Sequence, residues 1–132
     1  MKKTKVFIAI PTGGNIHVDL VFFLLNTDKD YDVKVDYVIG NFIAHNRNHL
    51  VDRFMQSKYE WLLFIDSDTM PPFDVLDMTK NGKDICSGVY FQWQEQKLIP
   101  LTYKKNKNDF HKKYIVFNET SKEDLVEVDG VG

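Results

Sequence analysis

The sequence predicts an α/β fold with a doubly wound, mainly parallel sheet. Three observations support this prediction. Short runs that are apolar throughout recur along the chain, as expected for strands buried on both faces. Segments with apolar residues at helical spacing separate these runs. The resulting order is strand, helix, strand, helix, strand, helix, strand, which is typical of a parallel sheet with right-handed crossovers.

The predicted strands are short and end at turn residues. The first covers residues 6–10 and stops at the sequence Pro-Thr-Gly-Gly. The second covers residues 32–39, where apolar side chains alternate, and it ends at Gly40. The third covers residues 61–65, and we expect it to be the most buried strand because it is apolar throughout. The fourth covers residues 85–90.

The predicted helices connect these strands. The first covers residues 16–27, and its expected buried face consists of Val18, Val21, Phe22 and Leu25. The second covers residues 43–56, where the residues at helical spacing are Ile43, Arg47, Leu50, Val51 and Phe54. The third is short and covers residues 72–80. It begins at a proline, which suits a first helical turn, and it ends before Asn-Gly.

The sequence after residue 93 has a different pattern. Residues 98–103 and 114–118 predict a hairpin around the segment KKNKNDFHKK, and residues 125–128 predict a last short strand. The chain stops on Gly-Val-Gly soon after that strand. We therefore expect one domain over residues 1–132, with a hairpin extension and an incomplete carboxyl-terminal part.

Composition narrows the classes of function and partner. The formal net charge is -2, whereas proteins that mainly hold nucleic acid are normally basic, so we expect no nucleic-acid partner. Residues 104–113 contain five lysines, which could approach an anionic acceptor, a phospholipid surface or nucleic acid, but we favour a solvated hairpin tip. The chain has one cysteine and no apolar run near the roughly 20 residues of a membrane helix. We expect a cytoplasmic protein without a transmembrane segment, which could be peripheral to a membrane.

The stretch YEWLLFIDSDTMPP places two carboxylates directly after an apolar run. Ligands bind at the carboxyl ends of strands in open α/β sheets, and Asp66 and Asp68 follow the third predicted strand. Side chains two residues apart on extended backbone point the same way, and hard oxygen ligands suit Mg²⁺ or Mn²⁺. Because substrate phosphates commonly complete such a metal shell, the pair predicts a cation that carries a diphosphate. An alternative is that Asp-Ser-Asp caps the turn that follows.

Four segments together resemble the nucleotide-binding half of a GT-A fold glycosyltransferase of the family-two type, as found in bacteria and phages. They are IAIPTGG, AHNRNHLVDRFM, WLLFIDSDTMPP and DICSGVYF. The resemblance covers nearly all of residues 5–132. It implies a Rossmann-like sheet of GT-A type and transfer of a sugar from a nucleotide-diphosphate sugar, with a UDP-sugar as the first expectation. The acceptor would be a hydroxyl of a carbohydrate, lipid or protein.

The resemblance also implies roles for particular residues. Pro11, Thr12 and Gly13 would lie beside the base and ribose of the nucleotide. Asp68 would hold Mn²⁺ or Mg²⁺ directly, while Asp66 would face the ribose or reach the metal through water. The metal would act as a Lewis acid on the departing nucleoside diphosphate.

Arg47 matches an arginine often found near the nucleotide in this family. A fixed cation also suits a diphosphate on physical grounds. Its alternative is a solvated residue on the surface of the second helix.

No residue of this chain matches the family's catalytic base. Inverting members carry that acid beyond the point where this chain ends, and nothing singles out Glu95 or Glu119. A catalytically inactive nucleotide-binding module is therefore one alternative function. A sugar-nucleotide nucleotidyltransferase is another, although its first loop would be richer in glycine and carry a basic residue, which PTGGN lacks. A haloacid dehalogenase-type phosphatase would carry its Asp-x-Asp on the first strand.

The histidines and the cysteine have simpler expectations. His45 and His49 lie one helical turn apart, but without the acidic residue that a zinc protease places between them, so we expect surface residues. Cys86 is expected in the core.

Overall fold

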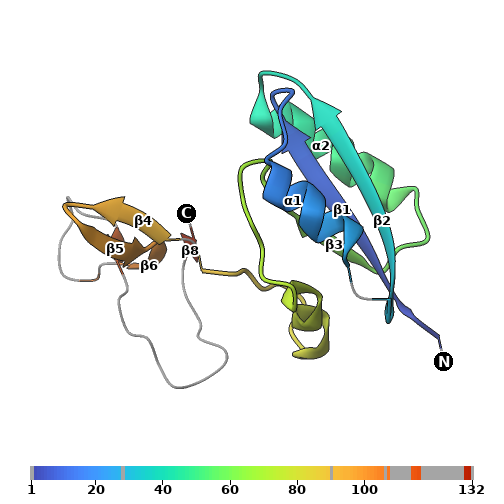
Figure 1. The fold of residues 1–132 in the computed structure, drawn as a ribbon. Coiled ribbons are helices and arrows are strands. Elements are labelled where there is room, and N and C mark those ends of the chain that lie inside the picture. Colours follow the sequence, from blue (N-terminus) through green and yellow to red (C-terminus); the bar gives the residue numbers. More distant parts are fainter. Residues whose placement is uncertain are drawn as a thin grey trace. The chain divides into compact units, whose positions relative to one another are not determined.

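A computed structural model describes residues 2–27, 29–89, 91–105, 107, 114–116 and 130–131. The chain divides into two compact units, Met1–Lys83 and Asp84–Gly132 (Figure 1). Among the described residues, no helix has the length and apolar character required to cross a membrane.

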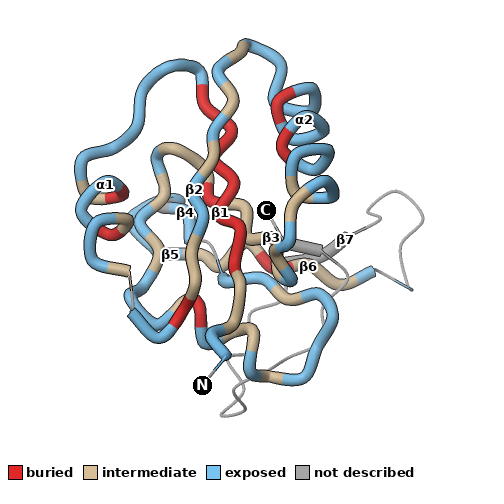
Figure 2. Tube along the Cα trace, turned by 90° about the vertical axis from the view of Figure 1, so that its right-hand side faces the viewer, coloured by how far each residue is buried: buried red, intermediate tan, exposed pale blue. Residues whose placement is uncertain are grey.

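The first unit is built around a parallel sheet of three strands in the order β2-β1-β3. The strands are β1 (Thr4–Thr12), β2 (Tyr31–Ile39) and β3 (Trp61–Phe64). Val6 of β1 lies opposite Val33 of β2 and Trp61 of β3, which fixes the register on both sides. Because β1 is central, it is the most buried strand (Figure 2). The expectation that residues 61–65 would be the most buried strand is wrong, since β3 is half-buried and, among the described residues, pairs with β1 alone.

Helices α1 (Val18–Leu25) and α2 (Ile43–Met55) cover opposite faces of this sheet (Figure 1). Successive side chains of β1 point to opposite faces, as in any strand. Val6, Ile8 and Ile10 accordingly pack with Leu20 and Phe23 of α1. On the other face, Phe7 and Ala9 pack with Leu50 of α2. Two hydrophobic clusters, one on each face, therefore hold the sheet between its helices.

The buried face of α1 differs from the expected one. Leu20 is fully buried, whereas Leu25 is 80% exposed. The other members of the expected face are also exposed, namely Val18, Val21 and Phe22. The helix reads VDLVFFLL, so apolar residues occupy nearly every direction and spacing alone does not select the side that meets the sheet.

The expected doubly wound, Rossmann-like sheet of GT-A type is wrong. The parallel sheet has three strands, and residues 85–89 of the expected fourth strand form neither helix nor strand. Ile85 is 92% exposed, so its segment lacks the buried neighbours that stabilise an apolar strand. The expected helix at 72–80 is a shorter 3₁₀ helix, η1 (Val75–Lys80). The described chain is a small mixed α/β structure with three helices.

Helix η1 is attached to the start of β2 by a polar network. The Tyr31 hydroxyl donates to Asp77 Oδ1 at 2.6 Å, and Lys80 Nζ lies 2.6 Å from the same oxygen. These two hydrogen bonds, with that from Lys80 the larger cause, lower the pKa of Asp77. Burial is the main cause that raises the pKa of Tyr31. Leu76 of η1 joins the same hydrophobic cluster as Tyr31, so polar and apolar contacts hold this helix together.

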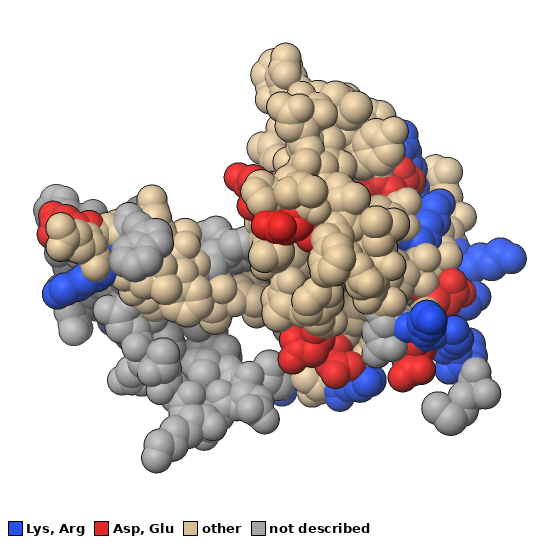
Figure 3. Space-filling view, viewed as in Figure 1, with Lys and Arg blue, Asp and Glu red and all other residues tan. Residues whose placement is uncertain are grey.

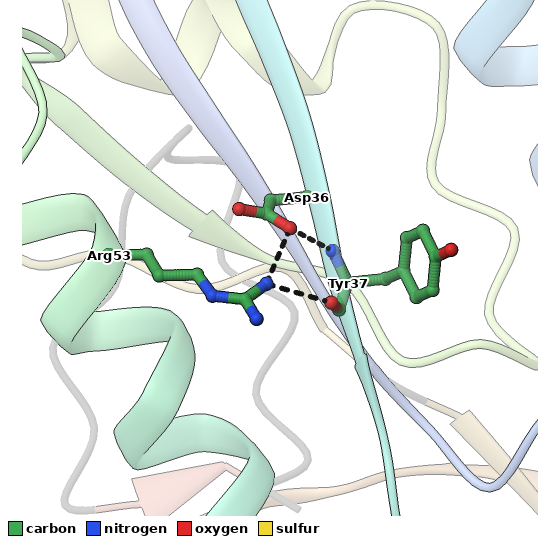
Figure 4. A network of polar contacts seen from close by, with 3 residues as sticks. All are labelled: Asp36, Tyr37 and Arg53. Atoms are coloured by element: carbon green, nitrogen blue, oxygen red, sulfur yellow. Dashed lines mark hydrogen bonds and ion pairs between the residues drawn. The ribbon is translucent and has the colours of Figure 1, made fainter.

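Helix α2 is attached to the edge strand β2 by Arg53 (Figure 4). Its Nη1 donates to Asp36 Oδ1 at 2.8 Å and to the Tyr37 carbonyl at 3.2 Å. Asp36 Oδ1 also accepts the Tyr37 backbone N–H at 2.8 Å. One guanidinium thus satisfies polar groups of β2 and fixes the helix against that strand.

The second unit is antiparallel. Strand β4 (Phe91–Gln94) pairs with β5 (Lys97–Pro100), and Glu95 and Gln96 between them both have positive φ, as in a tight two-residue turn. Strand β6 (Thr102–Lys105) pairs with β7 (Tyr114–Val116) and with β8 (Gly130–Val131).

The hairpin expected around KKNKNDFHKK is confirmed by the pairing of β6 with β7. Its first strand was expected at residues 98–103. This stretch is instead divided at Leu101, with the residues before it in β5 and those after it in β6. The last strand expected at 125–128 lies outside the described residues.

Candidate functional site

Three loops of the first unit meet at the carboxyl edge of its sheet. Each of the parallel strands β1, β2 and β3 ends at this edge, near the upper end of the unit in Figure 1. The connections from β1 to β2 and from β2 to β3 run in opposite directions across the sheet. Ligands of open α/β sheets bind at the carboxyl ends of strands where the connections diverge in this way.

The loop after β1 is shaped by Thr12. Its hydroxyl donates to the Asn15 carbonyl at 2.8 Å and accepts the Gly14 N–H at 3.1 Å. Gly14 has a φ of +126°, a backbone conformation that residues with a side chain rarely adopt, so glycine is required there. Neither Gly13 nor Gly14 would bring a Cβ within 4 Å of another atom, so the space beside this backbone is open.

The three residues expected beside the nucleoside have different exposures. The side chain of Pro11 is fully buried, and Thr12 is also buried, whereas Gly13 is exposed. Pro11 and Thr12 therefore fix the position of the loop, and Gly13 leaves its backbone exposed to solvent.

A buried asparagine joins the ends of β1 and β2. Asn46 is 1% exposed, and its Nδ2 donates to the Gly40 carbonyl at 3.0 Å and to the Thr12 carbonyl at 3.4 Å. The Gly40 N–H donates to the same Thr12 carbonyl at 3.0 Å. A Cβ on Gly40 would lie 2.6 Å from Asn46 Oδ1, so this approach requires glycine. The sequence interpretation missed Asn46.

The loop that carries the aspartates is fixed by backbone hydrogen bonds. Ile65 N–H donates to the Ala9 carbonyl at 3.0 Å, which continues the pairing with β1 past the end of β3. The Thr69 N–H then donates to the Asp66 carbonyl at 3.0 Å, which closes a turn. His17 N–H donates to the Ser67 carbonyl at 2.8 Å, so the loops after β1 and β3 are joined directly.

Arg47 of α2 is the partner of Asp66. Arg47 Nη2 lies 3.0 Å from Asp66 Oδ1, with the two side chains 48% and 38% exposed. The guanidinium also lies over the Phe64 ring, 5.6 Å from its centroid, an arrangement favourable for a cation. These contacts fix Arg47 at the carboxyl edge while a large part of it stays in contact with solvent.

Asp68 differs from Asp66. Its side chain is exposed, and within the described part of the chain it makes no hydrogen bond or ion pair. Neither carboxylate accepts a capping hydrogen bond from the described backbone, and Asp74, the residue before η1, makes no side-chain capping hydrogen bond. The turn is closed by the Asp66 carbonyl rather than by a carboxylate. This weakens the alternative that the pair serves only to cap a turn.

The arrangement provides oxygen ligands but no complete metal shell. Within the described residues, no three His, Cys, Asp or Glu side chains form a group that could hold a metal ion. Two carboxylates still suit Mg²⁺ or Mn²⁺, because such ions keep water and phosphate oxygens in most positions. Asp68 and the second oxygen of Asp66 are the groups that fit this chemistry.

Positive charge on the visible face of the unit gathers elsewhere. Figure 3 shows Lys and Arg side chains mainly near the end that carries the N-terminus, opposite the carboxyl edge. Arg47 is therefore the cation that we consider for an anionic ligand at this edge.

Comparison of the chain with models of protein families, with curated proteins and with solved structures finds no match.

Proposed function

We propose that the carboxyl edge of the sheet binds a nucleotide-diphosphate sugar together with Mn²⁺ or Mg²⁺. A UDP-sugar is the first candidate. The chain would then be the donor-binding part of a metal-dependent glycosyltransferase. The observation that carries this proposal is the Arg47–Asp66 ion pair. The loop of Asp66 also carries Asp68, which has no partner among the described residues, and it is hydrogen-bonded to the loop after β1, where the backbone of Gly13 is open.

The two aspartates have different roles in this proposal. Asp68 binds the metal directly, because its carboxylate is exposed and uncommitted among the described residues. Asp66 holds Arg47 through one oxygen and directs its other oxygen to the ribose or to a metal-bound water. When bound, the metal supplies Lewis-acid stabilisation of the departing nucleoside diphosphate.

Arg47 complements the diphosphate. A guanidinium forms charge-assisted hydrogen bonds with phosphate oxygens in a planar, two-pronged geometry. The ion pair with Asp66 and the Phe64 ring place this group in advance, so little side-chain freedom is lost when the ligand binds. The loop after β1, which contains Thr12 to Gly14, is joined to the aspartate loop by the hydrogen bond from His17 N–H to the Ser67 carbonyl. The ribose would meet the backbone of this loop rather than side chains.

Catalysis requires a general base that we do not assign to this chain. No further His, Cys, Asp or Glu joins Asp66 and Asp68 in a group within the described residues. This observation favours a second candidate function, a nucleotide-binding module that does not turn over its ligand. Both candidates share the same binding site. We place the protein in the cytoplasm, since its single cysteine suits a reducing compartment.

Titration calorimetry of UDP into the purified chain tests the shared claim. We expect binding in Mn²⁺ that is lost in EDTA and in Asp68→Asn. Asp52→Asn is the matched control, because Asp52 is exposed on α2 outside the site, and it should bind as the wild type does. GDP, CDP and dTDP identify the preferred base. Equal binding in Mn²⁺ and EDTA, or equal binding by the Asp68 variant, would overturn the proposal.

A further inference from the structure

We propose that His45 and His49 form a two-imidazole site for a divalent transition-metal ion on the exposed side of α2. The Nε2 atoms of the two rings lie 3.1 Å apart in a hydrogen bond, and the ring centroids are 4.4 Å apart at an interplanar angle of 86°. A metal ion would replace the shared proton, with each ring then protonated on Nδ1. Both residues are exposed, so an ion reaches them without any rearrangement of the core. This site is independent of the aspartates and of the proposed nucleotide function.

The spacing of the nitrogens matches a shared metal ion. Imidazole nitrogens bind Zn²⁺ at about 2.0–2.1 Å. Two such nitrogens would be about 2.9 Å apart at a right angle and about 3.3 Å apart at a tetrahedral angle. The observed 3.1 Å lies between these values. The helix sets this geometry, because residues four apart lie above one another on the same face.

The chemistry of the site predicts which ions it prefers. Imidazole suits copper, nickel and zinc, and affinity in such sites increases from Mn²⁺ to Cu²⁺. In the described residues no third His, Cys, Asp or Glu completes the group, so water would occupy the other positions. The hard ions expected at Asp66 and Asp68 prefer oxygen ligands. The two sites therefore differ in the metal they select.

Binding at this pair would stabilise the first half of α2. The ion would link one turn of the helix across the segment that contains Asn46 and Arg47. An ion that binds only the folded protein stabilises it in proportion to its occupancy. The thermal midpoint should consequently rise with the concentration of Zn²⁺, Ni²⁺ or Cu²⁺, and less with Mg²⁺.

The test uses untagged protein, so that no added histidines compete for metal. Zn²⁺ titration calorimetry should show one ion per chain, and thermal unfolding should show a midpoint that rises with Zn²⁺. Removal of one of two linked ligands loses the advantage of chelation, so His45→Ala and His49→Ala should each weaken binding at least about tenfold. Circular dichroism confirms that each variant still contains its helices.

Two controls separate this site from the others. His17→Ala removes an exposed histidine outside α2 and should leave the affinity for Zn²⁺ unchanged. The double variant Asp66→Asn with Asp68→Asn should also bind Zn²⁺ as the wild type does. Unchanged affinity in both His45→Ala and His49→Ala would overturn the proposal. Loss of Zn²⁺ binding in the aspartate variant would overturn it as well, by assigning the ion to the carboxyl edge.

Discussion

Arg47 and Asp66, 19 residues apart in the sequence, form an ion pair of 3.0 Å at the carboxyl edge of the sheet. The pair connects α2 to the loop after β3, which also carries the exposed Asp68. Ion pairs this exposed contribute only about 0–1 kcal/mol to stability. In the proposed function, the main role of this pair is to position Arg47 for the diphosphate.

Replacement of Arg47 should affect binding more than folding. We expect Arg47→Ala to weaken UDP binding in Mn²⁺ about tenfold or more, because hydrogen bonds to charged groups contribute about 1.5–3 kcal/mol. The free energy of unfolding should change by less than about 1 kcal/mol. Calorimetry and urea denaturation measure the two effects.

Arg53 is the matched control for Arg47. It lies on the same helix but contacts Asp36 and Tyr37 of β2 instead of the aspartate loop. Arg53→Ala should leave UDP affinity unchanged and lower the unfolding free energy by about 1 kcal/mol. Equal loss of UDP affinity in both variants would contradict a specific role for Arg47.

Gly40→Ala should destabilise the protein. The new Cβ would lie 2.6 Å from Asn46 Oδ1, and overpacking of this kind costs about 1–3 kcal/mol. Gly13→Ala is the control, since no atom lies within 4 Å of its Cβ position, and its cost should stay near that of an ordinary surface change, about 0.5 kcal/mol. Urea denaturation compares the two.

Asn46→Ala provides a second test of the same contact. It removes the oxygen that opposes a Cβ at Gly40, but it also removes two hydrogen bonds to carbonyls. The double variant with Gly40→Ala should therefore be more stable than the sum of the two single effects predicts. Strict additivity would show that the close approach is relieved in another way.

The packing of α1 predicts a contrast between two leucines. Leu20 is fully buried and Leu25 is 80% exposed, although both lie on the same short helix. Leu20→Ala should cost about 2–5 kcal/mol of unfolding free energy. Leu25→Ala should cost no more than about 0.5 kcal/mol. A larger loss of unfolding free energy in Leu25→Ala than in Leu20→Ala would indicate that the face expected from the spacing of the residues is the buried one.

Asp77 predicts a pH dependence. Hydrogen bonds from Lys80 and Tyr31 lower the pKa of this carboxyl in the folded protein. The charged form is favoured by folding, so its contribution is present above the unfolded pKa of about 3.9 and is lost as the pH falls through the lower folded pKa. The thermal midpoint of the wild type should exceed that of Asp77→Asn at pH 6, and the difference should shrink below about pH 4. A difference in thermal midpoint that does not change with pH would contradict a contribution from the lowered pKa of Asp77.

Periodicity predicted the parts of the fold that depend on local pattern. Residues 43–56 were expected to be a helix, and α2 covers Ile43–Met55. The apolar run of residues 6–10 lies within β1. Such segments are predictable because their apolar residues match a single period.

Other parts depend on neighbours that the local sequence does not reveal. The segment at 85–90 is apolar enough for a strand, but Ile85 is exposed and the described residues 85–89 do not pair. Helix α1 is apolar on nearly every side, so the position of the sheet decided which residues became buried.

The candidate site also combines features that local sequence predicts with features that depend on neighbouring elements. The motif drew attention to Asp66 and Asp68, and the family resemblance drew attention to Arg47, but the pairing of Arg47 with Asp66 requires α2 to pass beside the end of β3. Asn46 was missed because a polar residue in a helix is usually assigned to the surface. The available signal was its position four residues before the buried Leu50, on the same face of α2.

The most direct test of the central claim is to locate Mn²⁺ by NMR. Substoichiometric Mn²⁺ is added to ¹⁵N-labelled protein saturated with UDP, and the broadening of each amide signal is measured. We predict strong broadening at Gly13, Ser67 and Asp68, little broadening at Lys5 and Tyr31 at the opposite edge, and loss of the effect in Asp68→Asn. Broadening centred away from the aspartate loop, or unchanged in that variant, would contradict a metal–diphosphate site at the carboxyl edge.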